Sequence, residues 1–407
     1  MYKRQVEDID RIVRGVPGST LELEVRSNSK GIVENMSLTR SRVTRDNVPY
    51  YGMVRDGIGY VILTTFTMDA SKNIASAIKE LRKENNLEGI ILDLRSNGGG
   101  LLREAIDVSN LFIEKGEETV TTKAKVAEND QAYRTRNVPL DLDIPLAVMI
   151  NKRSASASEI VSGVVQDLDR GVLIGQRSFG KGLVQNTVTL PYNNRVKMTI
   201  SKYYIPSGRC IQGVEYDNGL PVDIPDDQRS TFKTRNGRDV LDGGGVTPDI
   251  KMDVKKESAI TKALKEEHLI FKYVNQYIIG QDSVKDAGSY VYNDWEDFKK
   301  FIDEEGFTFN TDSDKAIEAL EAAVKNDFSI ESADEIKALR AELSARKQAA
   351  WSHSKADIIL EIEKEIISRY FNQSGRIKFT LDKDPEIQKA VEILTNPSEY
   401  RKVLDGR

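Results

Sequence analysis

Two apolar segments in the middle of the chain constrain its fold more than any other feature. Gly89–Leu94 and Leu146–Ile150 have the length of β-strands and are almost continuously apolar, as is typical of strands buried on both faces of a sheet. A polar turn and then a helical pattern follow each of them. Similar strand patterns occur at Gly57–Thr65 and Gly171–Gly175, and an amphipathic helix is predicted over Ala70–Glu84. This alternation predicts an α/β fold with a largely parallel sheet.

The two polar turns mark the predicted location of a functional site. Arg95–Gly100 follows the first apolar segment, and Asn151–Ser158 follows the second. Sites in parallel sheets form at the carboxyl ends of the strands, so we expect these two turns to meet at one edge of the sheet.

The two ends of the chain are organised differently. The first residues lead into a helical pattern without the basic and apolar regions of a signal peptide. Strands are then predicted at Thr20–Val25 and Glu34–Arg42, which is too little for a complete domain, so we expect further sequence upstream. From about Lys255 the pattern predicts a separate helical domain, with helices at Ala259–Ile279, Trp295–Glu305, Asp314–Asn326, Ala333–Lys347 and Lys355–Phe371.

The composition excludes several classes of protein. A chain of 407 residues, 39% hydrophobic and 30% charged, is expected to fold into two to four globular domains. The net charge is −5 and Lys and Arg are scattered, which argues against nucleic-acid binding. Apolar runs such as Ile144–Ile150 are far shorter than the roughly 20 residues of a membrane span. Cys210 is the single cysteine, so no intrachain disulfide forms.

Three serines lie in the second polar turn, in the run Ser154-Ala-Ser-Ala-Ser-Glu159. A serine at a helix N-terminus can act as a nucleophile, because the backbone N–H groups there stabilise a developing oxyanion. The alternative is structural, since Ser-x-x-Glu is a capping box. On this run alone, the structural alternative is favoured.

Lys181 lies in a glycine-rich run, Gly175–Gly182. The run imitates a phosphate-binding loop, but Gly182 stands where that motif has Ser or Thr, which disfavours a nucleotide enzyme. Lys181 is then either an exposed turn residue or a general base.

Histidine is absent between Val43 and Asp253. A Ser-His-Asp triad, a Cys-His site and a His-rich metal site are therefore excluded from this region. A serine nucleophile needs another base, and lysine can serve when burial lowers its pKa to about 7–8. The glycines of Arg95–Gly100 allow backbone N–H groups to converge on an oxygen atom.

These segments together resemble one family. Asn151–Asp167 with Gly175–Gln185, preceded by Asp93–Gly100, is similar to the C-terminal processing peptidases, or tail-specific proteases, which are serine–lysine endopeptidases. Ser207–Gln212 and Gly245–Asp249 also look like landmarks of that family. The resemblance covers about residues 5–252 and implies acyl-enzyme cleavage of proteins that are recognised by their C-terminal tails.

The resemblance implies a role for each candidate site residue. Ser156 would be the nucleophile, Lys181 the general base, and Gln185 the residue that orients the lysine amine. The oxyanion hole would use the backbone N–H of Ala157 and that of a glycine in the run 98–100, with Gly100 preferred over Gly99. Ser154 and Ser158 would have capping or supporting roles. Neither a metal nor another cofactor is needed.

The resemblance also implies an architecture. The family has a crotonase/Clp-type α/β core, so we expect the C-terminal part of a PDZ domain over residues 1–45, the peptidase core over 46–252 and a helical C-terminal domain over 253–407. The implied partners are proteins or peptides with accessible C-termini, and a second copy or an adaptor that binds the helical domain. The implied location is the periplasm or cell envelope, reached through a signal or anchor upstream. The alternative is an inactive relative that serves as a peptide-binding or scaffold module.

Overall fold

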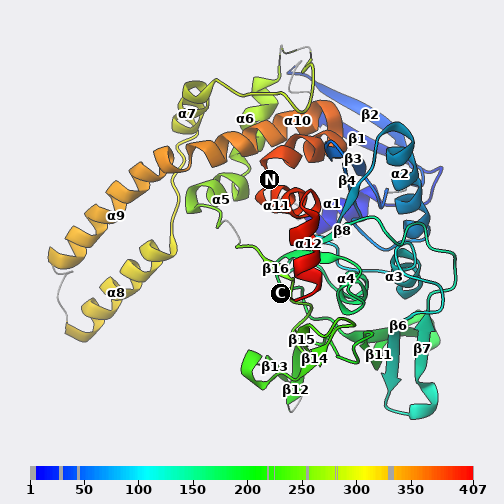
Figure 1. Ribbon diagram of the computed structural model, residues 1–407. Helices are drawn as coiled ribbons and strands as arrows, with labels where there is room; N and C mark the ends of the chain where they lie inside the picture. Colours follow the sequence, from blue (N-terminus) through cyan, green and yellow to red (C-terminus); the bar gives the residue numbers. More distant parts are fainter. Residues whose placement is uncertain are drawn as a thin grey trace. The chain divides into compact units, whose positions relative to one another are not determined.

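The computed structural model describes residues 6–26, 31–43, 46–217, 220–223, 225–253, 256–279, 281, 283–328 and 334–406. The chain divides into two compact units (Figure 1). The core unit consists of Asp46–Lys255 and Thr380–Arg407, and the helical unit of Met1–Arg45 and Lys256–Phe379. None of the helices in these described ranges combines the length and the apolar character needed to cross a membrane.

A six-stranded sheet lies at the centre of the core unit, in the order β16-β9-β8-β5-β4-β3. Its strands are β3 (Tyr50–Arg55), β4 (Ile58–Ile62), β5 (Gly89–Asp93), β8 (Leu146–Ile150), β9 (Val172–Gly175) and β16 (Ile250–Lys251). β3 runs antiparallel to β4, and the other neighbouring pairs are parallel. All residues of β5 and β8 are buried. The predicted α/β alternation with a largely parallel sheet is therefore confirmed.

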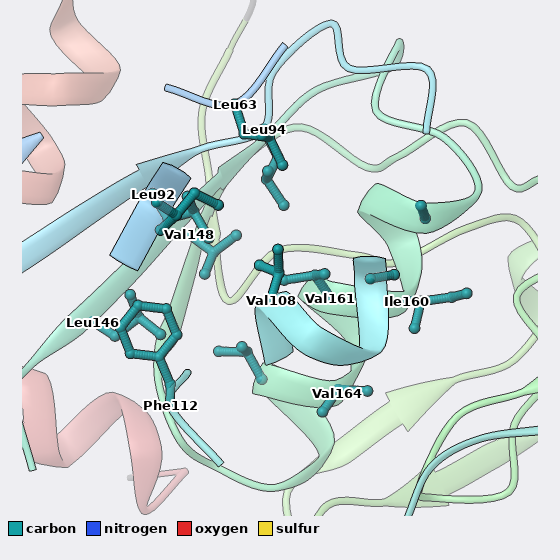
Figure 2. Packing of buried hydrophobic residues seen from close by; sticks show 14 of the residues in the cluster. Leu63, Leu92, Leu94, Val108, Phe112, Leu146, Val148, Ile160, Val161 and Val164 are labelled. Carbon is teal, nitrogen blue, oxygen red and sulfur yellow. The ribbon is translucent and has the colours of Figure 1, made fainter. Parts of the chain in front are cut away.

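Three helices cover one face of this sheet: α2 (Ala70–Glu84), α3 (Leu102–Ser109) and α4 (Ala157–Asp167). Leu92 and Val148 from the strands pack with Val108 and Val161 from the helices in one apolar cluster (Figure 2). Every residue of α4 is buried, because the other helices and the sheet surround it. The start of α4, which directly follows Ser156, is thereby buried.

The opposite face of the sheet is covered by α11 (Pro385–Leu394), which contacts β5, β8 and β9 and is followed by α12 (Pro397–Leu404) (Figure 1). Strand residues alternate in direction, so Ile91 and Met149 point away from the cluster of Figure 2. The buried apolar side chains of α11 are those of Ile387, Ala390, Val391, Ile393 and Leu394. Fully burying such a side chain stabilises a fold by about 1.5–3 kcal/mol. The Tyr400 hydroxyl of α12 accepts a hydrogen bond from Leu146 N at 3.0 Å.

A second, antiparallel sheet in the core unit has the order β10-β11-β6-β7 and was not predicted. Its strands are β6 (Glu118–Ala124), β7 (Gln131–Arg134), β10 (Leu183–Thr189) and β11 (Arg195–Tyr204). Two small hairpins follow, β12 (Val214–Asp217) with β13 (Leu220–Asp223), and β14 (Thr231–Lys233) with β15 (Asp239–Leu241). In the sequence, Lys181 lies in the segment that connects β9 of the central sheet to β10 of this second sheet.

The helical unit contains α5 (Ala259–Glu266), α6 (Leu269–Tyr277), α7 (Trp295–Glu304), α8 (Asp312–Phe328), α9 (Asp334–His353) and most of α10 (Lys355–Thr380). Aromatic rings fill its core: Tyr273 lies 5.0 Å from Phe298 and 5.4 Å from Phe301 between ring centroids. The N-terminal part has α1 (Val6–Val13) and an antiparallel pair, β1 (Thr20–Arg26) and β2 (Val33–Thr39).

The structure differs from the predicted helical region in two ways. The single helix predicted over Ala259–Ile279 is broken into α5 and α6, because His268 adopts a left-handed conformation with φ of 56°. The start predicted at Ala333 lies outside the described residues. More importantly, Thr380–Arg407 belongs to the core unit, whereas the sequence placed it in a helical domain over 253–407. Helical periodicity identifies an apolar face but not the surface that the face covers.

Candidate active site

Ser156 stands at the junction between the turn after β8 and helix α4. Its backbone has φ of 56° and ψ of −112°, a combination that side chains with a Cβ atom rarely adopt. Strain of this kind costs about 1–3 kcal/mol and persists only where the surroundings enforce it. A sharp, strained strand-to-helix turn is also how nucleophilic serines are presented in α/β-hydrolases. The conformation therefore supports a functional rather than a purely capping role for Ser156.

A cavity of about 280 Å³ lies beside Ser156. Lys181 and Gln185 line it, and so do Ala157 and Gly100. Its remaining lining residues are Leu101, Leu102, Ile160, Leu183, Val184, Lys197 and Tyr203. The structure thus brings together, around one cavity, every predicted site residue except Gly99.

The turn Arg95–Gly100, which we call the glycine turn, offers one backbone donor to this cavity. The Gly99 N–H donates to Asn97 Oδ1 at 2.9 Å, so it is already used. Over the described part of the chain, the N–H groups of Gly100 and Ala157 have no protein acceptor. Two such donors at one cavity can bind an oxyanion. Of the two predicted glycines, Gly100 is the one whose N–H is available.

Gly99 nevertheless has a close structural role. Its φ is 97°, and a Cβ atom there would lie 2.8 Å from Ser156 Cβ and 2.9 Å from Ala157 N. The turn therefore packs directly against the start of α4, and only glycine fits at this position.

The other two serines of the run hold the glycine turn. Ser154 Oγ donates to Leu94 O and Ser158 Oγ donates to Asn97 O, both at 2.8 Å. Asn97 is fully buried, and its Nδ2 donates to Leu63 O at 2.8 Å. These bonds fix the turn with respect to α4, which is the supporting role that was expected of Ser154 and Ser158.

Glu159 links Ser156 to the loop that carries Lys181. Its carboxylate accepts hydrogen bonds from Ser156 N at 2.8 Å, Ser178 Oγ at 2.6 Å, Gly180 N at 2.6 Å and Lys181 N at 2.8 Å. The residue is fully buried. Burial raises the pKa of Glu159 above its ordinary value of 4.5, and the four donors act in the opposite direction. The capping box recognised in the sequence is therefore part of a larger buried network.

Tyr203 of β11 closes the cavity from the second sheet. Its hydroxyl donates to the backbone carbonyl of Lys181. Burial and the nearby Glu159 raise the pKa of Tyr203 well above its ordinary value, and the Ser156 side chain acts in the opposite direction. Tyr203 thus binds the backbone of Lys181 and lines the same cavity as Ser156.

Arg95 anchors the other end of the glycine turn. Its guanidinium pairs with Asp93, Asp384 and Glu386 at 2.7, 2.8 and 2.5 Å. Burial lowers the pKa of Arg95, but the carboxylates outweigh burial and raise it above the ordinary value. Arg95 therefore remains a cation that joins β5 to the beginning of α11.

Sequence reasoning did not identify Asn97, Glu159 or Tyr203 as members of the site. Asn97 and Glu159 lie inside the quoted motifs, so their positions gave a usable signal, whereas Tyr203 lies on a strand that the pattern did not reveal. The phosphate-binding-loop interpretation is wrong, because strand β10 rather than a helix follows Lys181. In the described ranges, no group of three or more His, Cys, Asp or Glu side chains is placed to hold a metal ion.

A strained serine, a lysine and two available backbone N–H groups around one cavity are the parts of a nucleophilic acyl-transfer site. Residues 57–220 match peptidase family S41, and residues 260–394 match the C-terminal helical domain of a probable PDZ-protease. The chain therefore has the mixed α/β fold of S41 peptidases with an α-helical C-terminal domain, and the resemblance to C-terminal processing peptidases is confirmed.

Parts of this chain are similar to individual proteins whose names are known. A carboxy-terminal-processing protease of Bartonella bacilliformis is 35% identical over 225 residues, which are 54% of this chain and 50% of the relative. A chloroplastic carboxyl-terminal-processing peptidase 2 of Arabidopsis thaliana is 32% identical over 234 residues, 55% of this chain and 45% of the relative. A solved photosystem II D1 C-terminal processing protease is 27% identical with a TM-score of 0.40, covering 59% of this chain and 57% of that one. The chain spans about half the length of the curated relatives it matches.

Proposed function

We propose that this chain is a serine endopeptidase that cleaves protein substrates through a Ser156–Lys181 dyad. The observation that carries the proposal is the single cavity lined by Ser156, Lys181 and Gln185 together with Ala157 and Gly100. The strained backbone of Ser156 and the two available N–H groups support it further.

The proposed reaction is acyl transfer. The amine of Lys181 takes the proton of Ser156 as Oγ attacks the carbonyl carbon of the scissile peptide. The N–H groups of Ala157 and Gly100 bind the oxyanion of the tetrahedral intermediate. The lysine ammonium protonates the leaving amine as the C–N bond breaks. Water, deprotonated by the same lysine, then hydrolyses the acyl-enzyme.

Gln185 is proposed to orient the amine of Lys181. Strand β10 has a bulge between Val184 and Gln185, and a bulge redirects the side chain that follows it. Gln185 pairs in register with Thr199 of β11 and lines the same cavity as Lys181. Its amide oxygen can accept a hydrogen bond from an amine.

The test is cleavage of an unstructured protein with an apolar C-terminal tail. We expect Ser156→Ala and Lys181→Ala to lose cleavage by at least about 10³-fold. Lys152→Ala is the matched control for the lysine, because Lys152 is exposed on the turn before α4, and it should retain the wild-type rate. Undiminished cleavage by Ser156→Ala would mean that Ser156 is not the nucleophile.

The finer assignments belong to the same proposal. The core is of the crotonase/Clp type, residues 1–45 are the C-terminal part of a PDZ domain, and the enzyme acts in the periplasm or cell envelope. Substrates are recognised by their C-termini, so amidation of the tail should raise KM and leave kcat unchanged. Pairing with a second copy or an adaptor through the helical unit would appear as a larger mass in sedimentation.

The alternative proposal is an inactive relative that binds peptides or serves as a scaffold. The presence of Ser156, Lys181 and Gln185 at one cavity favours the enzyme. Tail-peptide binding without cleavage, equal in wild type and Ser156→Ala, would establish the alternative.

A further inference from the structure

Two carboxylates at the start of α11, those of Asp384 and Glu386, contact Arg95, which follows β5 in the core unit. Asp384 Oδ1 caps the helix, accepting hydrogen bonds from Glu386 N at 2.9 Å and Ile387 N at 3.3 Å. Its second oxygen, Oδ2, accepts from Arg95 Nη1 at 2.8 Å. Glu386 Oε2 accepts from the same Nη1 at 2.5 Å. One guanidinium nitrogen is therefore held by two side chains of α11.

Glu386 also contacts the loop that leads to Lys181. Its other oxygen, Oε1, accepts a hydrogen bond from Gln176 Nε2 at 3.3 Å. Gln176 follows β9 and begins the run that ends at Lys181, whereas Arg95 begins the turn that ends at Gly100. A single carboxylate thus bridges the two segments that deliver the base and an oxyanion donor to the cavity.

Neutralising the charge of Arg95 does not by itself explain the presence of the Glu386 carboxylate. Asp93 already pairs with Arg95 through Nε and Nη2, at 3.0 and 2.7 Å to Oδ2, and is only 2% exposed. Asp384 and Glu386 add two more negative groups, which are 22% and 12% exposed. Taking extra carboxylates out of water costs free energy, so a purely stabilising role explains them poorly.

We propose that Glu386, supported by Asp384, is a positioning residue of the peptidase site. It holds Arg95 and Gln176 so that the N–H of Gly100 and the amine of Lys181 face the same cavity. This inference rests on the proposed peptidase function. It makes α11, a helix far from the site in sequence, a part of the catalytic assembly.

The test is Glu386→Gln, which keeps the shape of the side chain and removes its charge. Because small misplacements of reacting groups lower the chemical rate, kcat should fall about tenfold while KM stays within about twofold. The midpoint of unfolding should not change. Glu392→Gln is the control on the same helix, since the Glu392 side chain is 65% exposed and pairs with Lys389 of that helix at 2.7 Å. It should keep the wild-type kcat.

A double-mutant cycle tests whether Glu386 acts through Arg95. If it does, Arg95→Lys combined with Glu386→Gln should lose little more activity than Arg95→Lys alone. Additive losses, or a wild-type kcat for Glu386→Gln, would overturn the inference. A loss of kcat in proportion to a lowered unfolding midpoint would overturn it too, because the role would then be structural.

Hydrogen exchange separates this inference from the proposed function. Glu386→Gln should speed amide exchange in residues 96–100 and 176–181, and Glu392→Gln should not. An active wild type with unchanged exchange and kcat in Glu386→Gln refutes only the positioning role. An inactive wild type refutes the proposed function, and exchange then still decides whether Glu386 holds the two segments.

Discussion

The carboxylate of Glu159 accepts a hydrogen bond from the backbone N–H of Ser156 at 2.8 Å. The same oxygen accepts one from the N–H of Lys181, also at 2.8 Å. The two proposed catalytic residues are thus tied through one buried side chain, although they lie on different segments of the core unit.

Replacing Glu159 with Gln should therefore disturb the site. A carboxamide has one acceptor oxygen and one donor nitrogen, so it cannot accept from all four donors that surround Glu159. We expect cleavage to fall about 10²-fold. Glu104→Gln is the control, because Glu104 also accepts from two backbone N–H groups, those of Asp69 and Ser71, outside the site. Equal losses in both variants would count against a specific role for Glu159.

The titration of Glu159 should also appear in the stability of the protein. Burial raises its pKa in the folded state above 4.5, so the folded protein holds the proton more tightly than the unfolded chain does. The corresponding stability is fully present below pH 4.5 and is lost as the pH rises through the raised pKa. We therefore expect the wild type to lose free energy of unfolding relative to Glu159→Gln as the pH rises through this window. Urea unfolding at a series of pH values measures this; a relative gain would mean that the four hydrogen bonds outweigh burial.

The backbone of Ser156 predicts an unusual order of variant stabilities. Ala retains the Cβ atom that makes φ of 56° unfavourable, whereas Gly relieves it. Ser156→Gly should therefore unfold at a free energy about 1 kcal/mol higher than Ser156→Ala. Within α4, Ser162 has ordinary helical geometry, and there Ala should be the more stable by about 1 kcal/mol. The same order at both positions would show that the strain at Ser156 is absent in solution.

Adjacent glycines in the turn should respond very differently to the same change. Gly99→Ala places a Cβ atom 2.7 Å from Ala155 O at a φ of 97°, so the turn must move away from Ser156. We expect it to abolish cleavage and to cost about 2 kcal/mol or more of stability. Gly98→Ala meets nothing within 4 Å and should be nearly neutral, as chemical unfolding and the cleavage assay will show.

The sequence predicted the parts of this molecule whose patterns are local. β5 and β8 are continuous apolar runs, and the turns that follow them meet at one cavity, as expected from the ends of neighbouring parallel strands. The preference for Gly100 over Gly99 came from the family resemblance, and the structure adds a physical reason, because the Asn97 side chain takes the N–H of Gly99. Strands β10 and β11 were missed because most of their side chains are exposed, which weakens the alternation that marks a half-buried strand.

The apolar face of α11 was missed for a different reason. Its partners, β5, β8 and β9, lie far away in the sequence, and long-range packing leaves no periodic signal. The pairing of Arg95 with Asp384 spans 289 positions and could be found only in three dimensions.

The placement of α11 has a consequence for how the protein is made. A ribosome adds roughly 5–20 residues per second, so about 15–60 s separate the synthesis of Arg95 from that of Asp384. During that time the sheet has emerged while the face that α11 covers is still open to solvent and to other chains. The core unit therefore closes only after Lys256–Phe379 of the helical unit has been translated, so translation itself delays the burial of this face of the sheet.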